Sequence, residues 1–212
     1  MRYERKYKVD QLSLDMVHQV IRSHPASFKK IFPDRQVNNI YFDTPGHRCY
    51  IDNVMGISHR KKVRVRWYGA KDNTHTQNTL EVKIKENELG RKESQPFPSF
   101  NWSDVPRLGQ QIDQLVNLGA TFQPVLLNAY HRSYYGTSNG QFRITIDHRL
   151  QYLPLARVGH NFQFQWEDPD VVVELKYDQD LEEKVQMIRQ YLPFRQTKSS
   201  KYVTGLSLLV ND

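Results

Sequence analysis

The sequence predicts an α+β fold, in which a closed antiparallel β-barrel of about eight strands is covered by a few helices. Three observations favour this fold. Most of the chain alternates apolar and polar residues with period 2, the pattern of β-strands. A few segments repeat apolar residues at helical spacing, and one face of strand after strand carries charge. We expect a single domain over residues 1–212.

The strand pattern is clearest in seven segments, and turn-forming clusters separate several of them. The predicted strands cover residues 2–9, 38–42, 59–68, 79–85, 126–135, 141–147 and 171–177. Shorter candidates cover residues 48–51, 91–95 and 162–166. The segment 95–102 contains two prolines and is the best candidate for a linker, but the strand pattern resumes after it.

Four helices are predicted from apolar stripes. The first follows Asp10, a plausible N-cap, and carries apolar residues between positions 12 and 21. The second is capped by Ser103 and extends over residues 108–118, and Gly119 follows its end. A third covers 181–192 and stops at Pro193. A short helix over 202–210 ends the chain.

The charged strand faces are the unusual feature of this sequence. Five rows contain nine bases and four acids: Arg2, Lys6, Lys62, Arg64, Arg66, Lys83, Lys85, Arg143 and Lys176, with Glu4, Glu81, Asp147 and Glu174. A solvated face explains any one row, but the opposite faces are apolar and suited to packing against helices. If the sheet closes, the charged rows meet inside, where they require water, counterions or a polyanion.

Composition limits the function classes. The chain has 30 Lys and Arg against 23 Asp and Glu, a formal charge of +7 and a pI near 9.4, which favours an anionic partner. A single cysteine, Cys49, excludes an internal disulfide and a Cys-based zinc cluster. No apolar run reaches the ~20 residues of a membrane span, and the start lacks a secretory signal, so we expect a cytoplasmic chain.

The acids among the bases narrow the ligand class. Phosphate groups need only cationic partners, whereas interspersed carboxylates suggest a divalent cation that travels with the phosphates. Mg²⁺ or Mn²⁺ takes one or two protein carboxylates and completes its shell with water and substrate oxygens. The sequence therefore favours a metal-bound triphosphate ligand, with Glu174, Glu4 and Glu81 as candidate metal ligands.

Seven segments together resemble the catalytic domain of the vacuolar transporter chaperone (VTC) proteins, the polyphosphate polymerase branch of the triphosphate tunnel metalloenzymes (CYTH-like superfamily). The likeness covers the chain from position 2 to about 205. The segments, in chain order, are RYERKYK (2–8), NIYFD (39–43), KVRVRWYG (62–69), LEVKIK (80–85), FRITID (142–147), VELK (173–176) and SSKY (199–202).

This resemblance implies a tunnel that holds a triphosphate or growing polyphosphate, with Mn²⁺ or Mg²⁺ as cofactor and ATP as substrate. It implies phosphate contacts from Lys6, Lys62, Arg64, Arg66, Lys83, Arg91, Arg132, Arg143, Lys198 and Lys201. It places Arg64, Arg66, Lys198 and Lys201 nearest the chemistry and Glu174 on the metal. It also implies a membrane-protein partner that would hold the chain at the inner face of a membrane.

The resemblance has one departure, and other functions stay open. The superfamily opens with Glu-x-Glu-x-Lys, whereas this chain has Arg2, Glu4 and Lys6, which favours polymerisation over two-metal hydrolysis. A triphosphatase is the main alternative, and a non-catalytic polyphosphate or nucleotide sensor is another. A nucleic-acid module would need bases and aromatic rings on one exposed face, and here they alternate to opposite faces, so we expect no nucleic-acid partner. No P-loop motif is present.

Overall fold

The computed structural model describes residues 2–70, 77–87, 89–116, 119–155 and 166–210. The strands are β1 (Arg2–Val9), β2 (Lys29–Asp43), β3 (His59–Tyr68), β4 (Asn78–Glu86), β5 (Leu89–Phe97), β6 (Gln123–Gly136), β7 (Phe142–Pro154), β8 (Trp166–Asp168) and β9 (Val171–Asp178). The α-helices are α1 (Leu14–Arg22), α2 (Arg48–Val54), α3 (Leu108–Leu115), α4 (Val185–Arg189) and α5 (Lys201–Val210). Two 3₁₀ helices are η1 (Trp102–Arg107) and η3 (Gln179–Leu181).

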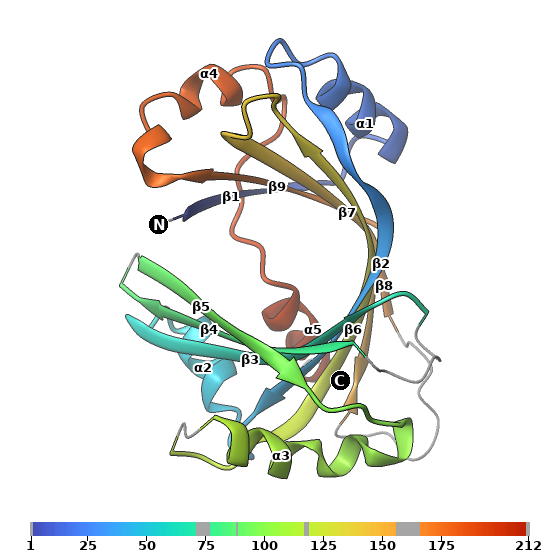
Figure 1. The fold of residues 1–212 in the computed structure, drawn as a ribbon, viewed down its shortest axis with the longest axis vertical. Coiled ribbons are helices and arrows are strands. Elements are labelled where there is room, and N and C mark those ends of the chain that lie inside the picture. The colour runs from blue at the N-terminus through green and yellow to red at the C-terminus, as the bar shows by residue number, and fades with distance from the viewer. Residues whose placement is uncertain (1, 71–76, 88, 117–118, 156–165, 211–212) are drawn as a thin grey trace. The chain divides into compact units, whose positions relative to one another are not determined.

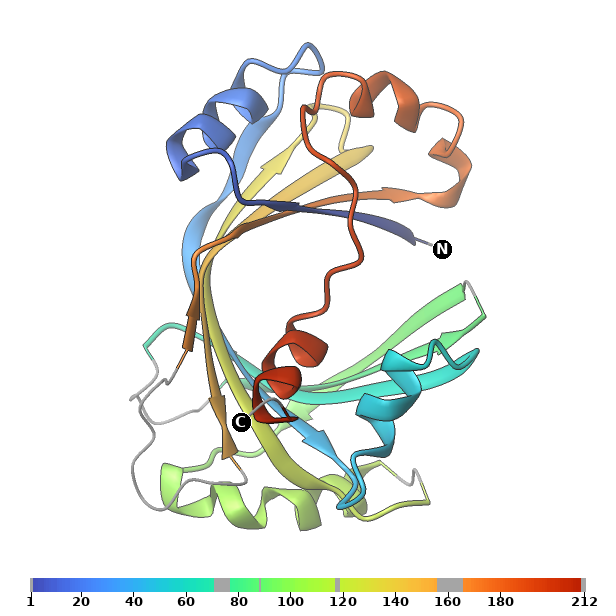
Figure 2. The ribbon, with the colours of Figure 1, turned by 180° about the vertical axis from the view of Figure 1, so that it is seen from behind.

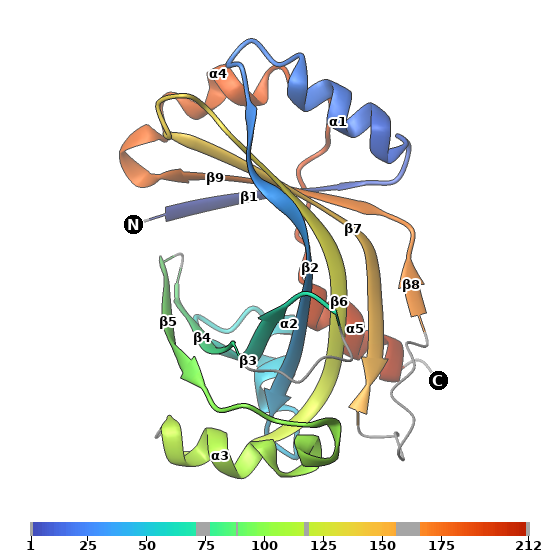
Figure 3. The same cartoon turned by 45° about the vertical axis from the view of Figure 1, so that its right-hand side comes forward.

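The strands form one sheet in the order β1-β9-β7-β6-β2-β3-β4-β5, with β8 paired to β7 (Figures 1 and 3). The α+β class is confirmed. The hydrogen-bonded order has two ends, β1 and β5, and no pairing joins them within the described residues. A closed barrel is therefore not confirmed. We inferred closure because we expected the charged rows to enclose an anion. In the structure, ion pairs such as Lys6–Glu174 and Arg64–Glu81 already compensate much of that charge.

The described residues group into two compact units, each assembled from three segments of the chain. Unit 1 contains residues 1–36, 130–150 and 168–199, and unit 2 contains residues 37–129, 151–167 and 200–212. Strands β2, β6 and β7 contribute residues to both units. The single domain expected from the sequence stays a prediction.

Unit 1 buries its apolar core between strands and two helices. Val17 and Ile21 on α1 and Val185 and Ile188 on α4 belong to one core with apolar residues of β1, β7 and β9. Figure 1 shows the two helices at the top. Tyr135 on β6 belongs to the same core. Because successive strand residues point to opposite faces, the even-numbered residues of β6 face away from this core.

In unit 2, α5 packs on β6 and β7, and β3 packs against the segment around η1. Helix α5 lies along strands of this unit (Figure 2). Gly205 allows the approach, because a Cβ there would lie 2.5 Å from a methyl carbon of Leu126 and 2.7 Å from the ring of Tyr152. At the other side of the core, the ring of Trp67 packs edge-on against Phe100 and Trp102, with centroids 5.7 and 6.1 Å apart.

Most strand predictions are confirmed, and one is wrong. Segments 2–9 and 59–68 match β1 and β3 residue for residue, and β2 extends well beyond the predicted 38–42. Residues 48–51 are helical and belong to α2. The cause is Asp43, whose buried carboxylate accepts hydrogen bonds from the backbone N–H groups of Thr44, Cys49 and Tyr50. The Asp43 side chain thus accepts hydrogen bonds from N–H groups in the first turn of α2, which have no partner within the helix. The candidate strand 162–166 falls mostly outside the described residues.

The helix predictions are right in place but wrong in their boundaries. Ser13, not Asp10, caps α1, and its hydroxyl accepts from the N–H of Met16 at 3.3 Å. Asn101 forms the capping box with Asp104, so Ser103 is inside η1, and α3 ends at Leu115. The predicted helix 181–192 is divided between η3 and α4. The C-terminal helix is confirmed as α5. None of the described helices is both long and apolar enough to cross a bilayer.

Candidate functional site: two carboxylate-centred cation clusters

Unit 1 contains a charged cluster built by strand register. Lys6 on β1 lies opposite Glu174 on β9, and Thr145 on β7 lies opposite Glu174 from the other side. Directly paired residues share a face of a sheet, so the rows seen in the sequence meet around Glu174. Arg132 joins them from β6, on the face opposite the apolar core.

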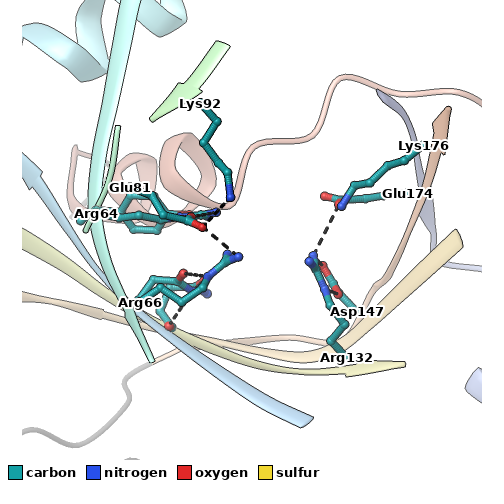
Figure 4. A network of polar contacts seen from close by, with 11 residues as sticks. Arg64, Arg66, Glu81, Lys92, Arg132, Asp147, Glu174 and Lys176 are labelled. Carbon is teal, nitrogen blue, oxygen red and sulfur yellow. Dashed lines mark hydrogen bonds and ion pairs between the residues drawn. The ribbon is translucent and has the colours of Figure 1, made fainter. Parts of the chain in front are cut away.

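Glu174 is the centre of this cluster (Figure 4). It is 4% exposed, and three cations surround its carboxylate. Lys176 Nζ lies 2.9 Å from Oε2, Lys6 Nζ lies 3.3 Å from Oε1, and Arg132 Nη2 donates to Oε2 at 3.4 Å. The hydroxyl of Thr145 donates to Oε2 at 3.4 Å. A buried carboxylate in such surroundings stays charged because its cations compensate for the lost hydration.

Asp147 orients Arg132. Its carboxylate is fully buried and accepts from Arg132 Nε at 2.5 Å and Nη2 at 2.6 Å, a bidentate pair. The guanidinium also lies over the ring of Tyr130, 5.2 Å from its centroid. Burial alone would lower the pKa of Arg132, but Asp147, Tyr130 and Glu174 together outweigh it, and the pKa lies well above its usual value.

Two cations of this cluster bridge pairs of carboxylates. Lys6 Nζ lies 3.3 Å from Glu4 and 3.3 Å from Glu174, and Arg132 Nη2 contacts both Asp147 and Glu174. Burial disfavours the charged form of Lys6, but Glu174 and Glu4 more than offset this effect, so its pKa is raised.

The carboxylates of this cluster offer hard oxygen atoms, the ligands that Mg²⁺ and Mn²⁺ prefer. Among the described residues no group of three His, Cys, Asp or Glu side chains could hold an ion by itself. The cluster therefore fits a cation that brings most of its ligands as phosphate oxygens and water.

Unit 2 contains a second cluster, centred on Glu81 (Figure 4). Its carboxylate is 5% exposed and accepts from Arg64 through Nε at 2.7 Å and Nη2 at 2.6 Å. Lys92 Nζ lies 2.9 Å from Oε1 of Glu81, and Arg66 Nη1 lies 3.8 Å from Oε2, the oxygen that Arg64 contacts. Burial would raise the pKa of Glu81, but Arg64, Arg66 and Lys92 lower it well below its usual range.

Neutral groups hold the arginines of unit 2 in place. Asn39 Oδ1 accepts from Arg66 Nε at 2.9 Å, and the hydroxyl of Tyr41 accepts from Arg64 Nη1 at 3.2 Å. Both partners come from β2, where Asn39 pairs with Arg66 and Tyr41 with Arg64. Each guanidinium is thus held on two sides, which reduces the ordering that an anion must impose on binding.

The remaining predicted residues lie in different places. Lys62 donates to the hydroxyl of Ser200 at 2.9 Å, next to Lys201, which is buried at the first position of α5. Lys83 is exposed and pairs with Lys62 across the strands, and Arg143 pairs with Lys176. Lys198 is exposed in the segment before α5. Arg91 lies opposite Ile84, on the other face of β5 from Lys92, and forms an exposed pair with Glu93 at 3.2 Å.

Sequence reasoning missed Lys92 and Asn39 as members of the clusters, and it did not foresee the pairing of Asp147 with Arg132. Residues 91–95 are all polar, so alternation could not show which of Arg91 and Lys92 faces Glu81. The register Lys83–Lys92 decides it. The alternation of Arg143, Thr145 and Asp147 placed Asp147 in a charged row, and this was the available signal that its side chain lies on the charged face.

A model of the VTC domain family matches residues 1–210. The chain belongs to the VTC domain family. No curated protein matches it.

Solved structures support the fold assignment. A proposed adenylate cyclase from Vibrio parahaemolyticus is 15% identical with a TM-score of 0.57, and the match covers 97% of both chains. A proposed adenylyl cyclase from Hippeastrum, whose description reports a dominant triphosphatase activity, is 13% identical with a TM-score of 0.53 over 97% of this chain and 96% of that one. A proposed adenylate cyclase from Bacillus halodurans is 13% identical with a TM-score of 0.59 over 94% of both. At these identities the VTC-domain chain shares with them the CYTH-like fold.

Proposed function

We propose that this VTC-domain protein is a metal-dependent phosphoryl-transfer enzyme acting on triphosphates, and that its reaction is polyphosphate synthesis from the γ-phosphate of ATP. The observation that carries the proposal is the pair of buried carboxylates, Glu81 and Glu174, each surrounded by three cations from neighbouring strands. Cations at this density suit phosphate oxygens, and family membership favours a triphosphate over other polyanions.

The proposed roles follow from the chemistry of each side chain. Arg64 and Arg66 present planar forks suited to two non-bridging phosphate oxygens, whereas Lys6, Lys62 and Lys201 supply point charges. In phosphoryl transfer, charge spreads over the equatorial oxygens, and fixed cations stabilise it without reorganising. Glu174 and Glu4 would hold Mg²⁺ or Mn²⁺, and such an ion would neutralise and orient neighbouring phosphates. In synthesis, the terminal phosphate of a bound chain attacks the γ-phosphorus of ATP and ADP leaves.

A triphosphatase is the second candidate, and a specific observation favours it. The Hippeastrum protein with the same fold is described as having a dominant triphosphatase activity. Hydrolysis uses water in place of the terminal phosphate and needs the same cationic groups. The position of Arg2, where the superfamily has a second glutamate, favours synthesis.

The two reactions are separated by their products. We would incubate the purified protein with ATP and Mn²⁺ and resolve the products on a polyacrylamide gel, with tripolyphosphate as a parallel substrate. Long polyphosphate supports synthesis, and orthophosphate released from tripolyphosphate supports hydrolysis. Tight polyphosphate binding without either product would contradict both enzymatic readings and favour a sensor.

Glu174→Gln is expected to abolish turnover while the protein stays folded, because the change removes a charged oxygen ligand at nearly constant volume. Glu183→Gln is the matched control, since Glu183 is exposed in the same unit and the change in net charge is the same. Initial rates and circular dichroism spectra of both variants give the comparison. Full activity of Glu174→Gln would contradict the metal role of Glu174.

A further inference from the structure

The Glu81 carboxylate in unit 2, like the Glu174 carboxylate in unit 1, is surrounded by cations from neighbouring strands. Around Glu174, Lys6 and Arg132 each contact a second carboxylate, Glu4 and Asp147 respectively. The carboxylate of Glu81 contacts the cations of Arg64, Arg66 and Lys92. Glu81 is therefore placed as an anion among three cations.

The contacts of Glu81 are those that a phosphate group would make. The Nε and Nη2 groups on one edge of Arg64 both contact a single oxygen of Glu81, Oε2, at 2.7 and 2.6 Å, and a phosphate oxygen can accept from the same edge. Lys92 adds a point charge at 2.9 Å on the opposite oxygen. Since one guanidinium edge cannot hold two anions at once, a phosphate that takes this edge must displace the carboxylate.

Displacement is physically feasible because the cations differ in how firmly they are held. Asn39 and Tyr41 hold Arg66 and Arg64 from β2 whether or not Glu81 is present. Lys92 is held loosely, with 53% of its side chain exposed, so it can turn toward an incoming anion. The arginine pair is thus preorganised by neutral groups, and Glu81 supplies the neutralising charge in the ligand-free protein.

We propose that Glu81 is an internal competitor for phosphate, which occupies the anion site of Arg64, Arg66 and Lys92 until the substrate's phosphate replaces it. This inference rests on the proposed function and assigns Glu81 a role different from metal ligation. Glu81 sets the threshold for binding: weak anions such as single orthophosphate do not displace it, whereas a multivalent triphosphate does. The same residue keeps three cations compensated in the empty site.

The test is equilibrium binding of tripolyphosphate without any metal, by titration calorimetry in a chelator-containing buffer. We expect Glu81→Gln to bind tripolyphosphate at least about ten-fold more tightly than the natural protein, because the competing charge is gone and the hydrogen-bonding shape remains. Orthophosphate affinity is expected to rise as well, which reduces the preference for the triphosphate. Glu86→Gln, at an exposed position of the same strand, is the matched control for the added net charge and should change affinity little.

Two outcomes would overturn the proposal. If Glu81 positions the arginines for substrate, Glu81→Gln will bind tripolyphosphate more weakly than the natural protein. If Glu81→Gln gains no more tripolyphosphate affinity than Glu86→Gln, the gain comes from the change in net charge and not from the removal of a competing carboxylate. Glu81→Asp is the second variant in case the Gln variant does not fold: it keeps the charge but withdraws the carboxylate by one methylene, and we expect an intermediate gain. Because no metal or turnover is involved, inactivity toward ATP would leave this result unaffected.

Discussion

At the scale of single residues, the two buried carboxylates show how one residue type serves two environments. Glu174 lies among cations that also contact Glu4 and Asp147, whereas Glu81 lies among Arg64, Arg66 and Lys92. Both are almost completely removed from water. A buried ion pair contributes little net stability compared with apolar packing, so such clusters point to function rather than to folding.

Acid titration tests the Glu81 cluster. The cations hold the pKa of Glu81 below that of the unfolded chain, so its stabilising contribution is complete above about pH 4.5 and is lost as the pH falls. We therefore expect the difference in unfolding free energy between the natural protein and Glu81→Gln to be largest at neutral pH and to shrink below about pH 4.5. Urea unfolding in phosphate-free buffer at several pH values measures it. A difference independent of pH would show that the Glu81 charge does not contribute.

At the scale of elements, the contact between Lys62 and Ser200 in unit 2 depends on how α5 docks. Gly205 faces Leu126 and Tyr152 at distances that leave no room for a Cβ, so α5 lies close to the strands. Lys201 and, just before the helix, Ser200 are positioned by this contact, and Ser200 accepts a hydrogen bond from Lys62. The hydroxyl of Tyr202 donates to Asp43 and ties α5 to the end of β2. Burial, followed by the negative charge of Asp43, raises the pKa of Tyr202 far above its usual value.

Gly205→Ala is expected to destabilise the protein by about 1–3 kcal/mol, because the added methyl group must push α5 away from Leu126 and Tyr152. Gly46→Ala is the control, since a Cβ at Gly46 meets nothing within 4 Å, and we expect a change below about 0.5 kcal/mol. Thermal and urea denaturation compare the two variants. Equal stability of both would show that α5 does not pack as closely as the structure has it.

At the scale of the whole molecule, the two units share strands. Each unit is assembled from three separate segments, and β2, β6 and β7 contribute residues to both. Neither unit corresponds to one continuous stretch of chain, in contrast to independent domains, whose boundaries usually fall in linkers. This arrangement favours the single domain that the sequence predicts.

Calorimetric unfolding tests that prediction. We expect one cooperative transition with equal calorimetric and van't Hoff enthalpies, because strand residues of both units belong to the same backbone segments. Gly205→Ala should then lower the temperature of the whole transition. Two separate transitions, with only one of them shifted by Gly205→Ala, would show that the units unfold independently.

The sequence alone determined the strand rows and their chemistry. Period-2 alternation located β1, β3, β4 and β9 to within a residue or two, because in each strand a row of polar residues alternates with a row of apolar ones. It failed where alternation is weak: residues 29–36 of β2 are polar or exposed, and residues 48–51 are helical through the distant carboxylate of Asp43.

The tertiary structure decided which charges meet. Arg64, Arg66, Arg132 and Glu174 could be chosen from the sequence, but their partners follow from register and side-chain reach, which no local pattern encodes. Register placed Lys92, and not Arg91, on the face of Glu81, and the fold brought Asp147 onto Arg132. Local alternation fixes which face a residue occupies, whereas pairing between strands distant in the sequence fixes its neighbours, and the chemistry of this protein depends on those neighbours.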